Sequence, residues 1–330
     1  MIKIILNNLS INSYSYLVLN RIFRKSKILF IPVRLIILIW DFIIGIPISI
    51  YYYLKVLNTS PKEKIAIVAI AKNESEYIEE WVAFHKAIGF DTIILYDNDS
   101  TDGMTGKIMK YVDEGFIILN RISGIKQQYN AYNHAIKQYK HEYKYMAFID
   151  CDEFILPINN GENIKEILDK QFKNKCFAGG IGVNWCMYGS SGHLTKPKGL
   201  LIDNFVYRSK ITGKGNNCIK TIAKPECIYK FNHPHFPLYK SFYYNINFKG
   251  LYIPYWENII NEYVGLRINH YFTKSKEQWI KRRALGMADC GPNSKRTLDE
   301  FYEHDNNDIL DPLATYYSDK VKNLIISHNV

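Results

Sequence analysis

Three acidic residues follow directly on a strongly apolar stretch near the middle of the chain. Residues 146–149 read Met-Ala-Phe-Ile, which predicts a buried strand, and Asp150, Asp152 and Glu153 come next. Because side chains alternate along an extended segment, the two aspartates point the same way. Carboxylates at a strand's end lie where open α/β sheets bind ligands, and two of them can share a hard divalent cation. An isolated Asp-x-Asp is also typical of a solvated turn, so its surroundings must decide.

A second acidic loop begins at Asp97, directly after another predicted strand. It belongs to a stretch in which apolar runs alternate with helical periodicity. Strands are expected at 65–70, 92–96 and 116–119, and helices at 104–113 and 126–140. Another helix is expected after Asn73, which is placed to cap it, with Glu76 completing a capping box. This alternation predicts a parallel sheet with right-handed crossovers, so the two acidic loops should meet at one edge.

The chain downstream of residue 157 shows weaker periodicity. A helix is expected at residues 164–172 and a strand-like return at 220–225. Between them lies a Gly/Ser-rich loop that carries Trp185 and Tyr188. This composition is typical either of a loop that stacks a sugar ring or of a plain turn with an aromatic core, and the sequence leaves both open.

Histidines occur in two segments that differ in what they can bind. His233 and His235 are separated only by a proline, a spacing that disfavours a metal site. His270 follows an apolar strand, and Lys274 and Ser275 stand at the start of a predicted helix. This second segment offers one metal ligand and an anion cradle at a helix N-terminus.

Composition and charge exclude several classes of protein. The 330 residues carry a net charge of +10, and residues 1–60 contribute +6 of it, with seven basic residues against one acidic. Charge concentrated at one end indicates a basic arm facing anionic lipid rather than a nucleic-acid binder. The six cysteines form no C-x-x-C pair, which favours a reducing compartment. The length allows one large α/β domain or two domains.

Residues 28–54 form an apolar stretch long enough to cross a bilayer, for which about 20 apolar residues suffice. Arg34, Asp41 and two prolines interrupt it, and one charge near the centre of a spanning helix costs about 2.5–3.5 kcal/mol. An interfacial anchor, a true span and a buried helix pair therefore all remain open. We expect a membrane-associated protein, monotopic or single-pass, whose active site faces the cytoplasm.

Six motifs in order resemble glycosyltransferase family 92 and its bacterial relatives in the wider family-2-like group. They are Lys72-Asn-Glu, Tyr96-Asp-Asn-Asp-Ser-Thr-Asp102, Phe148-Ile-Asp-Cys-Asp-Glu-Phe154, Tyr188-Gly-Ser-Ser-Gly-His193, Lys220 to Pro225, and His270-Tyr with Lys274-Ser275. The resemblance covers roughly residues 64–290. It implies a GT-A fold, which is a Rossmann-like, mostly parallel sheet with helices on both faces. We therefore expect a hydrophobic helical segment at 1–60, the glycosyltransferase domain at 61–290, and a polar tail at 291–330.

The same resemblance assigns roles to individual residues. It implies that Mn²⁺ or Mg²⁺ is held by Asp150, Asp152 and His270 on the diphosphate of a nucleotide sugar, in particular a UDP-sugar. A cation there acts as a Lewis acid and template as the nucleoside diphosphate leaves. The residues expected to bind the nucleotide sugar are Asn73, Glu74, Asp97, Asp99, Gln128, Asn133, Asp150, Lys220, Lys274 and Ser275.

The reaction implied is transfer of a sugar, such as a galactose-like hexose, with inversion to a hydroxyl of a glycan or lipid-linked glycan. Inversion needs one carboxylate as general base within hydrogen-bond reach of the acceptor hydroxyl. Asp203 is the first candidate, Glu226 the second, and Glu153 the third.

Three other functions stay open at this point. A glycoside hydrolase also uses two carboxylates, but it needs no metal and holds them about 5 or 6.5–9.5 Å apart. A nucleotidyltransferase of similar fold would have a Gly-rich basic loop after the first strand, where this chain reads Ala69-Ile-Ala-Lys-Asn-Glu. A non-catalytic membrane scaffold is the third alternative.

Overall fold

Strand β1 (Ile65–Ala71) lies at the centre of the fold, and its side chains are buried on both faces. Ile65, Ile67 and Ala69 belong to the larger hydrophobic core, while Ala66 and Val68 belong to a second core on the opposite face. A continuous apolar run, without polar alternation, is what a strand covered on both faces requires.

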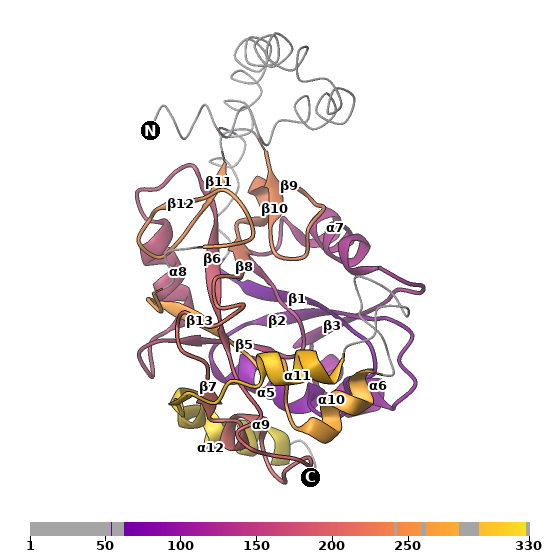
Figure 1. Cartoon of the computed structure of the whole chain (residues 1–330). Helices are drawn as coiled ribbons and strands as arrows, with labels where there is room; N and C mark the ends of the chain where they lie inside the picture. The colour runs from indigo at the N-terminus through magenta and orange to yellow at the C-terminus, as the bar shows by residue number, and fades with distance from the viewer. Residues whose placement is uncertain (1–53, 55–62, 241–242, 259–261, 284–296, 328–330) are drawn as a thin grey trace, which may run out of the picture.

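The structure is a computed structural model that describes residue 54 and residues 63–240, 243–258, 262–283 and 297–327 (Figure 1). Besides β1, its strands are β2 (Thr92–Asp97), β3 (Ile117–Arg121), β4 (Tyr145–Phe148), β5 (Glu153–Pro157), β6 (Ala178–Met187), β7 (Tyr207–Arg208), β8 (Ile219–Ala223), β9 (Ile228–Phe231), β10 (Pro237–Tyr239), β11 (Tyr244–Ile246), β12 (Tyr252–Ile253), β13 (Leu266–His270) and β14 (Ile309–Leu310). Its helices are α5 (Ile78–Ala87), α6 (Met104–Asp113), α7 (Gln128–Tyr139), α8 (Ile164–Phe172), α9 (Leu201–Asn204), α10 (Lys276–Arg283), α11 (Leu298–His304) and α12 (Ser318–Ile326), with the 3-10 turns η2 (Pro225–Cys227) and η3 (Leu313–Tyr317).

The main sheet runs in the order β12-β11-β6-β8-β4-β1-β2-β3, and β13 joins it by pairing with β5 and β6. Strands β3, β2, β1 and β4 pair in parallel. Strand β8 is antiparallel to both β4 and β6, and β13 runs parallel to β6. The carboxyl ends of β1, β2, β3, β4, β6 and β13 therefore share one edge of the sheet, where the acidic loops were expected. The predicted α/β class with a mostly parallel central sheet is confirmed.

Helices cover both faces of this sheet. Helix α7 and strand β9 close the smaller core, and α5, α6, α8 and α12 close the larger one (Figure 1). The helices predicted at residues 104–113 and 164–172 are confirmed. The capping box predicted at Asn73 is wrong, because α5 begins at Ile78 and its N-cap, Tyr77, makes no side-chain capping bond. Instead, Asn73 Oδ1 accepts a hydrogen bond from the backbone N–H of Thr101 at 2.8 Å.

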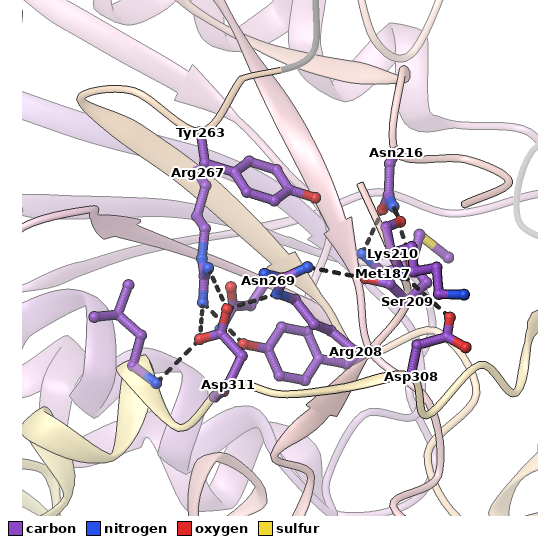
Figure 2. Close-up of polar contacts among 12 residues, drawn as sticks. Met187, Arg208, Ser209, Lys210, Asn216, Tyr263, Arg267, Asn269, Asp308 and Asp311 are labelled. Carbon is purple, nitrogen blue, oxygen red and sulfur yellow. Dashed lines mark hydrogen bonds and ion pairs between the residues drawn. The ribbon is translucent and has the colours of Figure 1, made fainter. Parts of the chain in front are cut away.

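The C-terminal segment that was expected to be a polar tail packs onto the domain over residues 297–327. Helix α12 lies against α5, and Val321 is fully buried. Asp311 accepts hydrogen bonds from Arg267 on β13 and from Arg208 on β7 (Figure 2). Other polar side chains of the segment also bond to the domain, since Asp305 accepts from Ser190 and Asp308 accepts from the backbone N–H of Lys210.

The predicted membrane-associating segment, residues 1–60, lies outside the described residues. Within the described part of the chain, no helix is long and apolar enough to cross a membrane.

Candidate active site

Asp150 leaves the end of β4 and lies between two polar side chains from other elements. Its Oδ1 accepts a hydrogen bond from Gln128 Nε2 on α7 at 2.7 Å. Its Oδ2 accepts one from Lys220 Nζ on β8 at 2.8 Å. Lys220 is fully buried, whereas the Asp150 side chain is 37% exposed, so the carboxylate is the part of this pair that faces the open edge. Three residues expected at the donor site are thus brought together.

Asp152 is buried and faces two cationic or potentially cationic groups. Arg282 Nη1 on α10 donates to its Oδ2 at 3.0 Å, and His270 Nε2 at the end of β13 lies 3.6 Å from its Oδ1. Burial alone raises the pKa of the carboxyl, but the charge of Arg282 and the contact with His270 bring the pKa of Asp152 well below its usual range. Asp152 is therefore an anion even though it is buried.

Glu74, in the loop after β1, extends this charged cluster. Its carboxylate lies 3.3 Å from Arg282 Nη2 and 3.8 Å from Lys274 Nζ. The Lys274 ammonium also lies over the Tyr77 ring, 4.7 Å from its centroid. Burial, and then the neighbouring charge of Arg282, lower the pKa of Lys274. Two cations and two carboxylates thus meet at the edge of the sheet, an arrangement suited to a charged ligand.

Glu153 lies beside Asp150 but turns into the protein. Its Oε2 accepts a hydrogen bond from the backbone N–H of Asp150 at 3.0 Å, and its Oε1 has no hydrogen-bond partner among the described residues. Lys220 Nζ is 3.7 Å away. Burial is the largest influence, and together with the nearby charges of Asp150 and Asp152 it outweighs Lys220 and raises the pKa of Glu153 well above its usual range.

The loops after β1, β2 and β3 bond to one another on the other flank of β4. Asp97 Oδ1 accepts from the backbone N–H of Ser100, and the Ser100 Oγ accepts from the backbone N–H of Asn73. Asp99 adopts a left-handed backbone and accepts from Ser123 Oγ at 2.7 Å. The bond from Ser123 is the main cause that lowers the pKa of Asp99. The loops expected to hold the nucleoside are therefore pre-formed.

Four residues expected at the site bond elsewhere. The Asn133 side chain exchanges two hydrogen bonds with the backbone of Phe231, which ties α7 to β9. Ser275 Oγ bonds to Gln278 within the first turn of α10. Asp203 is bound by Ser318 and Lys322 of the C-terminal segment. Glu226 lies three residues beyond the end of β8, near the amino end of β4, and pairs there with His141. These placements count against Asp203 and Glu226 as general bases.

Asp152 Oδ1 and His270 Nε2 are the atoms best placed to hold a divalent cation. At 3.6 Å they are too far apart for a hydrogen bond and close enough for both to contact one small ion. Both oxygens of Asp150 are taken by Gln128 and Lys220. Within the described residues no three His, Cys, Asp or Glu side chains gather as a metal site. The geometry fits a cation that takes two protein ligands and completes its shell with phosphate oxygens and water.

Arg282 is a site residue that sequence reasoning did not select. It contacts Asp152, 130 positions earlier in the chain, and Glu74, 208 positions earlier. Its sequence context, Lys281-Arg-Arg283, is that of a solvated helical face. The available signal was the position of this basic run at the end of α10, the helix that follows His270 and Lys274 and the strand that reaches the acidic edge.

The fold is that of an α/β protein with a cluster of charged side chains at the carboxyl edge of its sheet, and sequence comparison identifies its family. Residues 66–279, more than half of the chain, match the model of glycosyltransferase family 92. Among curated relatives, a glycosyltransferase family 92 protein of Ricinus communis is 24% identical over 71% of this chain and 40% of its own length. One of Arabidopsis thaliana is 24% identical over 41% of this chain and 25% of its own length.

The protein belongs to glycosyltransferase family 92, and it spans less than half the length of these curated relatives. Solved structures overlap with it more loosely. Residues 1–349 of Staphylococcus aureus TarS in complex with UDP are 18% identical, with a TM-score of 0.33 over 49% of this chain and 47% of that fragment. Glucosyl-3-phosphoglycerate synthase of Mycobacterium tuberculosis is 17% identical, with a TM-score of 0.24 over 37% of this chain and 44% of the synthase.

Proposed function

We propose that this chain is a metal-dependent, inverting glycosyltransferase that moves a sugar from a nucleotide sugar to a hydroxyl of a glycan or lipid-linked glycan. The observation that carries the proposal is the pair of strand-end carboxylates, Asp150 and Asp152, each held against a different cation at the carboxyl edge of a parallel sheet. A carboxylate pair with compensating cations suits a ligand that brings both a divalent ion and phosphates.

The donor diphosphate is proposed to bind over Asp150 and Asp152. Asp152 and His270 would hold Mn²⁺ or Mg²⁺, which would neutralise the charge that develops on the leaving diphosphate. Lys220 and Arg282 supply protein cations within 4 Å of these carboxylates, and Lys274 lies 3.8 Å from Glu74 in the same cluster. Each of them is released from part of its present pairing when phosphate oxygens arrive.

The nucleoside is proposed to lie over β1 and β2. Asp97 is the last residue of β2, and Asn73 lies in the neighbouring loop that follows β1. An acid at a strand end can accept a hydrogen bond from a ribose hydroxyl or a base N–H. A UDP-sugar is the donor that we would test first.

Inversion requires a base that takes the proton of the acceptor hydroxyl as it attacks the anomeric carbon. Of the three acids considered, Glu153 is the one beside Asp150 and Lys220. Its raised pKa makes it a stronger base than an ordinary glutamate once it is ionised. We propose Glu153 as the base, reached when donor binding draws Lys220 and Asp150 apart.

The acceptor is proposed to be presented at a membrane surface. The support is the basic arm and the apolar stretch at residues 28–54, which suit contact with anionic lipid. The cysteine pattern favours a site that faces the cytoplasm.

The experiment that tests this function is a donor screen. The purified protein is incubated with a panel of nucleotide sugars and Mn²⁺, with and without a chelator, and release of the nucleoside diphosphate is measured. We expect release from at least one donor, and loss of that release with the chelator. Equal release with the chelator would overturn metal dependence, and glycan cleavage without a nucleotide sugar would indicate a hydrolase.

A further inference from the structure

A row of aromatic rings leads away from the candidate active site, starting at His270. The centroids of His270 and Trp185 are 4.3 Å apart, and those of Trp185 and His235 are 4.9 Å apart. From His235 the row continues to the rings of His233 and Trp256, whose centroids lie 5.3 Å and 6.3 Å from that of His235. Because His270 contacts Asp152, the row begins at the proposed diphosphate site and runs outward.

Trp256 forms the outer end of the row and presents its indole to solvent. The side chain is 39% exposed, although a tryptophan is a residue that folding normally buries. On one side, the ring of His233 stacks on it with an interplanar angle of 17°. The backbone carbonyl of Trp256 accepts a hydrogen bond from the N–H of Ile219 at 3.1 Å, directly before Lys220. The backbone of Trp256 is thus tied to the strand that also carries a donor-site lysine.

Polar atoms lie along the row as well as ring faces. Trp185 Nε1 is a buried N–H donor with no hydrogen-bond partner within the described residues. His235 Nδ1 donates to the backbone carbonyl of Ile219 at 2.8 Å, which leaves Nε2 as the acceptor of a neutral ring. Burial, and then Lys220, lower the pKa of His235 to about 2, so the ring stays neutral. A donor nitrogen and an acceptor nitrogen therefore lie beside the rings.

The row lies on the opposite flank of the sheet from the proposed nucleoside site. In the sheet order, β1 and β2 stand on one side of β4, and β8 and β6 stand on the other. Trp185 belongs to β6, and Trp256 is bonded to β8, so both belong to the second flank. A nucleotide sugar that binds over β1 and β2 and reaches the diphosphate site leaves the flank at β6 and β8 free for the acceptor.

We propose that Trp185, His235 and Trp256 form a subsite that binds a pyranose ring of the acceptor glycan. A pyranose has an apolar C–H face that stacks on a flat aromatic ring and hydroxyls at its rim that hydrogen-bond to neighbouring donors and acceptors. Trp256 supplies the exposed ring, and Trp185 Nε1 and His235 Nε2 supply the polar partners. The subsite rests on the proposed glycosyl transfer and adds to it a position and a chemical class for the acceptor.

The test compares Trp256→Ala with the matched control Tyr255→Ala, which removes a neighbouring aromatic that is 58% exposed. Full-length wild type and variants are applied to an array of pyranose-containing glycans in the presence of UDP and Mn²⁺. Nucleotide-sugar hydrolysis without acceptor is measured in parallel. We expect wild type and Tyr255→Ala to bind at least one glycan, and Trp256→Ala to bind it about tenfold more weakly while its donor hydrolysis stays within about twofold.

Equal glycan binding by Trp256→Ala and wild type would overturn the subsite. So would a Trp256→Ala protein that loses UDP binding, because the ring would then belong to the nucleotide. Wild type that hydrolyses a donor but binds no glycan of the array would also count against it, while the proposed function would stand. Trp256→Phe keeps a flat ring and should restore most binding, and matching thermal unfolding curves exclude a folding defect.

Discussion

Two arginine–aspartate pairs in this protein have the same chemistry but differ in how completely they are bonded. Asp311 accepts two hydrogen bonds from Arg267, both at 2.7 Å, and one from Arg208 at 2.6 Å (Figure 2). Asp152 accepts one hydrogen bond from Arg282 at 3.0 Å and faces His270 across 3.6 Å. The first pair uses all of its carboxylate capacity within the protein, and the second keeps part of its capacity for a ligand.

The difference follows from where the pairs lie. Asp311 and Arg267 join the C-terminal segment to β13, and the Tyr188 hydroxyl completes their network. A bidentate, multiply bonded pair fixes the position of a strand. Asp152 and Arg282 lie at the open edge, where Arg282 is shared with Glu74. We infer that the pair at Asp311 holds β13 in place and that the pair at Asp152 is exchanged when substrate binds.

Asp152→Asn should have the largest effect on function. The amide keeps the shape but removes the charge that would hold the cation and diphosphate, so donor turnover should fall by about 10³-fold. The variant should unfold at nearly the denaturant concentration of wild type, since Arg282 keeps Glu74 as a partner. Nucleotide-sugar hydrolysis and urea unfolding measure the two quantities. Turnover close to wild type would contradict the role of Asp152.

Asp311→Asn should have the largest effect on stability. It leaves Arg267, which is only 4% exposed, without its counter-charge, and breaking a buried ion pair in this way costs about 3–5 kcal/mol. Urea unfolding monitored by circular dichroism gives the change in the free energy of unfolding. If this substitution cost as little stability as Asp152→Asn, the contrast between the two pairs would be lost.

Acid should remove the stability that Asp311 provides. Burial raises the pKa of this carboxyl, but the hydrogen bonds from Arg267 and Arg208 outweigh burial and bring the pKa of Asp311 below its ordinary value of 3.8. Because the folded-state pKa is the lower one, the contribution is present above about pH 4 and is lost as the pH falls further. The free energy of unfolding, measured between pH 6 and pH 2.5, should therefore fall less steeply with falling pH for Asp311→Asn than for wild type. The same pH dependence of the free energy of unfolding in both proteins would contradict this role.

Much of the fold follows from local pattern, and the C-terminal third shows where local pattern fails. Apolar runs such as Ile65 to Ile70 indicate strands buried on both faces, and their regular alternation with helices implies the parallel order. The segment around Asp311 has a polar sequence, and no residue near it in sequence indicates that Asp311 pairs with Arg267. Its structure depends on contacts between positions 44 and 103 residues apart.

The residues of the candidate site likewise fall into those that local sequence predicts and those that depend on distant contacts. Asp150, Asp152 and Asp97 were predicted because each directly follows an apolar strand, so their location depends on one local rule. Arg282 was missed, and Asp203 was favoured as a base, because both depend on how distant elements pack. Asp203 is held by Ser318 and Lys322 of the segment whose docking the sequence did not predict.

Glu153→Gln should give the smallest effect on stability, seen as a change in its pH dependence. Burial, with Asp150 and Asp152 nearby, raises the pKa of Glu153 well above its ordinary value of 4.5. A carboxyl with a raised folded-state pKa contributes stability below its unfolded pKa and loses it as the pH rises. The variant should therefore lose less stability than wild type between pH 5 and pH 8. Its transfer rate should fall by at least about 10²-fold, because the proposed base is gone. An unchanged rate would remove Glu153 from catalysis.

The central claim is that Asp152 anchors a divalent cation and a nucleoside diphosphate at the carboxyl edge of the sheet. Isothermal titration of UDP into wild type and Asp152→Asn, each with Mn²⁺ and with a chelator, tests it directly. We expect heat of binding for wild type with Mn²⁺, at least tenfold weaker binding for wild type with the chelator, and none for the variant. Equal binding of UDP by wild type and Asp152→Asn, with or without Mn²⁺, would contradict the claim.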